Sequence, residues 1–221
     1  MIKIEKIEVS GWSAALRGMR NPLNSWDQSD TIWGEKRDDG LMEYRVPQIG
    51  PKDLALAKKL AAAGPDHGKF LRMITVSMDI TAPMYWWKEF DTYKVGTVRN
   101  SCSTMHKIAA KTFVRDDFSH EHLDAANMDL LDTTIMALNI SRIAYMTSKD
   151  KKAWWQMIQL LPASYNQKAT VTVNYQVLKN IWNARKDHKL DEWRDYCCMI
   201  EYLPYSCLIT GKGEPSGNEE A

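Results

Sequence analysis

Residues 120–147 contain neither proline nor glycine, and their apolar side chains recur at three- and four-residue spacing. That spacing places apolar side chains on one face of a helix, so it predicts a long helix across this stretch. Ser119 is expected to cap the helix, since serine is a favoured N-cap residue. The acidic residues around His120 and His122 then suit the positive end of the helix dipole better than they suit a metal site.

Shorter patterns complete the fold prediction. Alternating apolar and polar residues predict strands over 2–9, 70–81 and 167–173. Apolar periodicity, prolines near helix starts and glycines near helix ends predict further helices over 13–20, 50–64, 83–94, 149–161 and within 174–203. We therefore predict one α+β domain over residues 1–210, with helices packed on a small sheet. The Gly-, Pro- and acid-rich residues 211–221 are expected to form a flexible tail.

The composition limits the partners and the cellular setting. A net charge of +1 over 221 residues gives no broad positive field, so no nucleic-acid partner is expected. No apolar stretch is long enough to cross a membrane, and the N-terminal segment lacks a signal-peptide pattern, so we expect a cytoplasmic protein without membrane contact. The four cysteines form no CxxC pair, which fits reduced thiols and predicts no metal site.

Side-chain chemistry leaves the catalytic residues unknown. Cys102 and His106 could touch at the i, i+4 spacing of a helix, as a nucleophile and its base require, although an inert thiol is the commoner explanation. Arg185 lies on a helix face expected to pack inward, where it needs an anionic partner such as a phosphate, Asp187 or Glu192. Nine tryptophans and nine tyrosines fit either a ring-rich core and interface or stacking against a planar ligand.

The order of these features resembles the flavin-dependent thymidylate synthase family. That family has a His after a helix, then a strand, Ala-Pro, a helix ending in Arg-His-Arg, and a later Ser. A long helical stretch closed by Leu-Pro and a Thr-x-Asn-x-Arg segment follow. The matching pieces here lie between about residues 50 and 205, and they are His67, Ala82-Pro83, Ser103, Leu161-Pro162, Thr172, Asn174, Leu178, Asn180 and Arg185.

Several arginines of the family pattern are replaced in this sequence. Arg-His-Arg becomes Tyr93-Lys94-Val95, the Asn-Glu before the serine becomes Asn100-Ser101, and Asn-x-Arg becomes Asn174-Tyr175-Gln176. In the family these arginines hold the flavin and dUMP phosphates, and such charge-assisted contacts contribute about 1.5–3 kcal/mol each. Arg72 and Arg99 lie within the resembling segments and are candidate substitutes.

The resemblance implies two groups of ligand-binding residues. The nucleotide-binding group is Arg72, Glu89, Lys94, Arg99, Asn100, Ser101, Ser103, Gln176 and Arg185. The flavin-binding group is His67, Tyr93, Asn174, Asn180 and Lys189.

The resemblance also implies a homotetramer with pockets where subunits meet. Because the departures fall on phosphate and flavin contacts, we predict a diverged protein that binds a nucleotide or related anionic ligand in these pockets without flavin chemistry, for instance to sequester a nucleotide. The alternative is an active FAD-dependent thymidylate synthase, or a related flavoenzyme that modifies pyrimidine nucleotides. A third hypothesis is a protein kept only for assembly.

Overall fold

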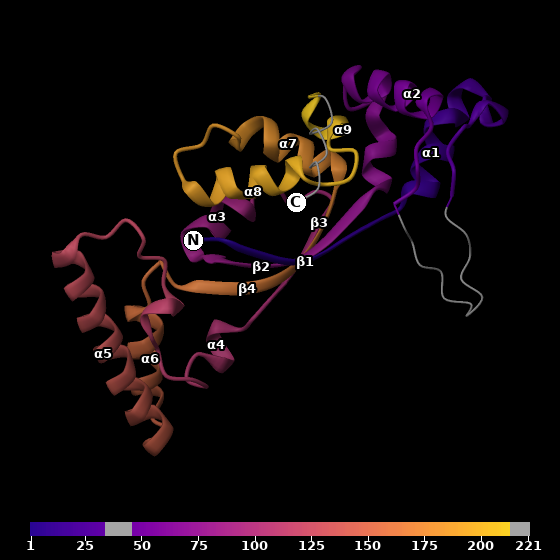
Figure 1. Cartoon of the computed structure of the whole chain (residues 1–221). Helices are drawn as coiled ribbons and strands as arrows, with labels where there is room; N and C mark the ends of the chain where they lie inside the picture. Colours follow the sequence, from indigo (N-terminus) through magenta and orange to yellow (C-terminus); the bar gives the residue numbers. More distant parts are fainter. Residues whose placement is uncertain (34–45, 213–221) are drawn as a thin grey trace, which may run out of the picture. The chain divides into compact units, whose positions relative to one another are not determined.

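The computed structural model describes residues 1–33 and 46–212 (Figure 1). Its strands are β1 (Lys3–Ser10), β2 (Thr75–Pro83), β3 (Thr97–Ser101) and β4 (Asn166–Asn174). Its α-helices are α1 (Trp12–Arg20), α2 (Pro51–Ala62), α3 (Met84–Phe90), α4 (Thr104–Lys107), α5 (Ala125–Ser148), α6 (Lys151–Leu160), α7 (Tyr175–Arg185), α8 (Asp191–Glu201) and α9 (Cys207–Thr210). Within these residues, none of the helices is both long and apolar enough to span a membrane.

The strands form one four-stranded sheet with the order β1-β2-β4-β3. Two cross-strand hydrogen bonds fix the register of the central pair. The hydroxyls of Ser77 and Thr172 lie 2.9 Å apart, and Thr170 donates to Asp79 Oδ1 at 2.7 Å. The residue number falls on β4 as it rises on β2, so these two strands are antiparallel.

The chain groups into two compact units. Unit 1 consists of Met1–Glu5, Asp79–Thr92 and Arg99–Thr170, and unit 2 consists of the described residues of Lys6–Met78, Tyr93–Val98 and Val171–Ala221. The single domain predicted over 1–210 is not decided by this grouping and stays a prediction. Most of the tail predicted at 211–221 lies outside the described residues.

Unit 1 is built around the pair of helices α5 and α6, which lie side by side (Figure 1). Leu131, Ile135 and Leu138 form the buried face of α5 and pack in one cluster with Met157 of α6 and with Phe118. This buried face follows the i, i+4, i+7 spacing that the sequence shows. The long helix predicted from the sequence is therefore confirmed, and one face of it forms the core of the unit.

Unit 2 packs helices around a ring-rich core. Trp12 of α1 makes edge contacts with Tyr175 of α7 and with Tyr205, each with ring centroids 5.4 Å apart. The Tyr205 hydroxyl accepts a hydrogen bond from Ile49 N and donates to Pro47 O, each at 2.8 Å, which ties the chain before α2 to this core. Some of the many tryptophan and tyrosine side chains therefore pack in this core.

The starts of two elements were predicted wrongly. The strand predicted over 70–81 begins only at Thr75, because residues 68–73 form a 3₁₀ helix and strict alternation of buried side chains starts after it. The helix predicted over 120–147 begins at Ala125, and its N-cap is Asp124, which accepts from Asn127 N at 2.9 Å. Ser119 instead donates to Asn166 Oδ1 at 3.0 Å, so its hydroxyl does not cap this helix.

The helix predicted from Pro83 also ends earlier than expected. It stops at Phe90, and β3 follows at Thr97, where no strand was predicted. Gly96 between them has φ +78, and a Cβ there would lie 2.5 Å from Asn174 Nδ2, so the turn needs glycine. None of the side chains of β3 is buried, and its partner strand β4 lies far away in the sequence. No local pattern therefore indicates this strand.

Candidate functional site

Arg99, a predicted nucleotide-binding residue, has a structural role in unit 1. Its Nη1 donates to both carboxylate oxygens of Asp91, at 2.9 and 2.7 Å, and its Nη2 donates to Gln167 Oε1 at 2.5 Å. The guanidinium carbon lies 3.9 Å from the centroid of the Trp87 ring. These contacts hold β3 against the end of α3 and the start of β4, and they use most of the donors that a phosphate would need.

The other predicted residues of unit 1 occupy exposed or capping positions. Asn100 and Ser101 are exposed on β3, and Glu89 is half-buried on α3. Ser103 caps the short helix α4 by accepting from His106 N at 3.0 Å. Cys102 precedes that helix, so Cys102 and His106 do not have the helical spacing that a nucleophile pair required.

His120, considered as a metal ligand together with His122, contacts the backbone instead. His120 Nδ1 lies 2.7 Å from the Phe118 carbonyl oxygen, and the neighbouring Glu121 is paired with the N-terminal ammonium group. No group of three metal-binding side chains is present among the described residues.

In unit 2, Arg185 lies among aromatic rings. Its Nε donates to the Tyr93 hydroxyl at 3.0 Å, and its guanidinium carbon lies 4.9 Å from the Trp193 ring centroid and 5.9 Å from that of Tyr93. The two rings make an edge contact of 6.1 Å. A guanidinium held this way has a fixed orientation, which suits recognition of an anion.

The remaining predicted residues of unit 2 fall into two sets. Asn174 caps α7 by accepting from Val177 N at 3.0 Å, and Gln176 donates to Asn180 Oδ1 at 3.0 Å, so these amides are paired within the helix. A second set is exposed, and it consists of His67, Arg72, Lys94 and Lys189. The structure therefore gathers Tyr93 with Arg185, and Gln176 with Asn180, but it gives the exposed set no common site within the unit.

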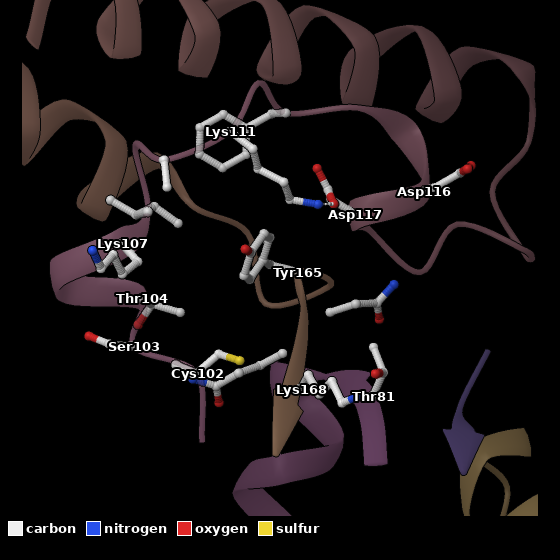
Figure 2. Close-up of a pocket in the computed structure, with 15 residues that line it drawn as sticks. Thr81, Cys102, Ser103, Thr104, Lys107, Lys111, Asp116, Asp117, Tyr165 and Lys168 are labelled. Carbon is white, nitrogen blue, oxygen red and sulfur yellow. Dashed lines mark hydrogen bonds and ion pairs between the residues drawn. The ribbon is translucent and has the colours of Figure 1, made fainter. Parts of the chain in front are cut away.

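Unit 1 contains a cavity of about 380 Å³ around Tyr165, which we call the Tyr165 cavity. Its lining comes from β2, from α4 and the chain that follows it, and from the start of β4. Figure 2 shows Tyr165 between Lys111 on one side and Cys102 on the other. Ser103, the retained serine of the family pattern, lines the same cavity.

Three lysines line the Tyr165 cavity, namely Lys107, Lys111 and Lys168. Lys111 is ion-paired with the buried Asp117, whose hydrogen bond raises the pKa of the Lys111 ammonium. Lys168 is paired with Asp79 at 3.1 Å and lies 3.9 Å from Glu5, and these contacts raise its pKa. Both lysines are cationic at neutral pH.

These lysines and Tyr165 were not among the residues predicted from the sequence. They lie in residues 104–117 and 165–168, outside the motif positions that carry the family resemblance, and only the cavity brings them together. The one available signal was the i, i+4 spacing of Lys107 and Lys111, but surface lysines at that spacing are common.

No family model and no curated protein matches the sequence. Two of the solved structures that resemble this one match nearly the whole chain. Thymidylate synthase X (ThyX) from Helicobacter pylori with FAD and dUMP has a TM-score of 0.67 at 16% identity, covering 96% of this chain and 98% of that one. A flavin-dependent thymidylate synthase ThyX from the same organism, complexed with FAD and dUMP, has a TM-score of 0.64 at 17% identity, covering 95% and 98%.

These matches show the fold. The chain has a thymidylate synthase X-like arrangement of helices on a small sheet, and the family resemblance seen in the sequence is confirmed at that level. At this level of sequence identity, the structural similarity does not establish a shared activity.

Proposed function

We propose that this protein binds a nucleotide or a related anionic ligand, in pockets formed where its subunits meet, without carrying out the flavin reaction. The observation that carries the proposal is the fold match, which covers 98% of chains that were crystallised with FAD and dUMP. A sequestering protein needs such a pocket but needs no reduced cofactor. The nucleotide-binding residues under this proposal are those carried over by the resemblance apart from Arg99, whose donors are occupied by Asp91 and Gln167, with Arg185 as the main anion contact.

The flavin-binding positions fit a flavin diphosphate poorly. None of them is an arginine, and several of their polar atoms already have partners within the chain. Asn174 caps α7, Asn180 accepts from Gln176, and the Tyr93 hydroxyl accepts from Arg185. A diphosphate is best bound by the forked donors of arginine or by free backbone N–H groups. This internal pairing supports ligand binding without flavin chemistry.

The proposal is tested by thermal unfolding of the purified protein with a panel of nucleoside mono-, di- and triphosphates. A ligand at about 100 times its dissociation constant adds about 2.7 kcal/mol to the free energy of unfolding, so a nucleotide that binds is expected to raise the melting temperature clearly. If every nucleotide leaves the melting temperature unchanged, the protein does not bind this class and the proposal fails.

The second candidate function is an active FAD-dependent enzyme acting on a pyrimidine nucleotide. It is favoured by the same neighbours, because both contain FAD. FAD would then contact His67, Tyr93, Asn174, Asn180 and Lys189. The absorbance spectrum separates the two candidates. A yellow protein with about one flavin per chain favours the enzyme, and a colourless protein that does not retain added FAD favours the binding protein.

We further propose that the chain forms a homotetramer, and α5 offers a surface for it. Met136, Ile140 and Ile143 lie at i, i+4 and i+7 on the face of α5 opposite its buried residues, and each is about 60% exposed. A row of large apolar side chains is costly to expose to water and typical of a contact surface.

Replacing Ile140 and Ile143 together by glutamate is expected to shift the protein from tetramer to smaller species, because the charges cannot be buried against a second copy. Sedimentation velocity at several concentrations measures the shift. The control is Asn127→Glu with Ser148→Glu, two exposed polar positions of the same helix that lie off this row. A wild-type protein that sediments as a monomer at every concentration contradicts the tetramer.

A further inference from the structure

A second hollow lies in unit 2, along α1 and the chain that follows it. Four of its six lining residues follow the i, i+3, i+4 and i+7 spacing of one helix face, and they are Ala14, Arg17, Gly18 and Asn21. Trp26 and Met73 complete the lining, and the volume is about 450 Å³. We call this hollow the Trp26 groove. It shares no residue with the nucleotide- and flavin-binding positions named above.

Trp26 gives the groove an exposed aromatic surface with a fixed orientation. Its indole N–H donates to Asn21 Oδ1 at 2.8 Å, and the residue is still 53% exposed. Met73, which is 46% exposed, adds a polarisable thioether that can adapt to different contacts. An exposed tryptophan and an exposed methionine in one groove are typical of the anchor positions of protein interfaces.

Gly18 keeps the groove open. A Cβ there would lie 3.1 Å from Met73 Sδ and 3.3 Å from Met73 Cε, which is closer than ordinary van der Waals contact. Glycine inside a helix lowers the stability of the helix relative to alanine, because it loses more backbone entropy on folding. This glycine leaves the space in which the end of the Met73 side chain lies, so the groove is kept at the expense of helix stability.

Arg17 is the one charged residue among the described residues that line the groove. Within the described part of the chain its one hydrogen bond runs from Nε to Ser13 O, at 3.3 Å, and it forms no ion pair there. Nη1 and Nη2 are therefore available to a ligand. Because a guanidinium donates two parallel hydrogen bonds to a carboxylate, the groove complements an apolar side chain that lies close to a carboxylate.

The groove is too open to enclose a small molecule. Ligand pockets bury about 70–90% of a small ligand, whereas this groove leaves both Trp26 and Met73 about half exposed. We propose that the Trp26 groove docks an extended acidic segment of a partner protein, with an apolar side chain of that segment against Trp26 and a neighbouring Asp or Glu carboxylate on Arg17. The inference goes beyond nucleotide binding and does not depend on it.

The test selects short peptides from a random phage-displayed library on the immobilised full-length protein and measures a labelled, enriched peptide by fluorescence anisotropy. The enriched peptides are expected to carry an aliphatic, aromatic or proline residue close to Asp or Glu. Trp26→Ala is expected to weaken binding of the labelled peptide at least about tenfold, because a central aromatic anchor dominates such contacts. Gly18→Leu fills the groove while favouring the helix, so it is expected to weaken binding without loss of folding.

The charge is tested by a double substitution. Arg17→Gln is expected to weaken binding about tenfold, and to have no further effect on a peptide whose Asp or Glu has been replaced by its amide. Trp33→Ala removes an exposed tryptophan of the same segment that does not line the groove, and it is expected to bind as the wild type does. Nucleotide binding is expected to be the same in all these variants, so the docking proposal and the proposed function can fail separately.

Three results would overturn the proposal. The first is that no peptide is enriched on the wild-type protein. The second is that the enriched peptides bind equally well to wild type, Trp26→Ala and Gly18→Leu, which would place them elsewhere on the chain. The third is that Trp26→Ala sediments as a smaller species than the wild type, which would show that a second copy of this chain occupies the groove.

Discussion

Replacing Asp53 by alanine is expected to lower the free energy of unfolding by about 3–5 kcal/mol, because it leaves a buried guanidinium without its counter-charge. Asp53 is 0% exposed and its partner Arg20 is 4% exposed. Arg20 Nε donates to Asp53 Oδ1 at 2.5 Å, and the hydroxyls of Ser29 and Thr31 donate to Oδ2 at 2.6 Å each. This network joins α1, the chain after it and the first turn of α2 in unit 2.

Chemical denaturation of the variant and the wild type measures the loss. The control is Asp27→Ala, an exposed aspartate of the same segment, which is expected to change stability by no more than about 0.5 kcal/mol. A loss below about 1 kcal/mol for Asp53→Ala would mean that the pair does not hold these helices together.

The same network predicts an acid-dependent stability. Burial alone would raise the pKa of Asp53, but hydrogen bonds from Ser29, Thr31 and Arg20 outweigh it and lower the pKa below its ordinary value of 3.8. The stabilisation is therefore fully present above about pH 3.8 and is lost as the pH falls through the lower pKa of the folded state. In Asp53→Ala this part of the acid dependence is expected to be absent.

Replacing Arg185 by alanine is expected to weaken nucleotide binding by about 10- to 150-fold, equivalent to about 1.5–3 kcal/mol for a charge-assisted contact to an anion. The guanidinium is already fixed by the hydroxyl of Tyr93 and by the Trp193 ring, so little entropy is lost when it binds a ligand. Equilibrium dialysis with a labelled nucleotide measures the change.

Two further variants make that result specific. Arg185→Lys keeps the charge but loses the planar fork, so it is expected to recover only part of the affinity. Arg17→Ala removes an exposed arginine of the same unit and is expected to bind as the wild type does. Equal affinities for wild type, Arg185→Ala and Arg185→Lys would remove Arg185 from the binding site.

Local signals predicted the presence of α2, α5 and α6. Pro51 begins α2, α6 ends before Pro162, and the period of apolar residues marks α5. β3 escaped prediction because its side chains are not buried and its partner β4 is far away in the sequence. The 3₁₀ helix at 68–73 escaped because its buried residues, Phe70 and Leu71, looked like the start of the strand that follows it.

The candidate site was less predictable, because spacing locates a residue along the chain and does not show what its side chain contacts. Arg99 lies where a phosphate contact was expected, yet Asp91 and Gln167 occupy its donors. Ser103 and Asn174 are helix caps, a role that short polar residues fill in any helix. Lys111 joins Tyr165 only through the fold, so no local pattern could have selected them together.

Calorimetric titration of the flavin-free protein with dUMP is the decisive experiment. We expect saturable binding of about one dUMP per chain, with no requirement for FAD. Absence of any dUMP binding until FAD has been added would contradict it, because the pocket would then depend on the cofactor and the flavoenzyme would be the correct function.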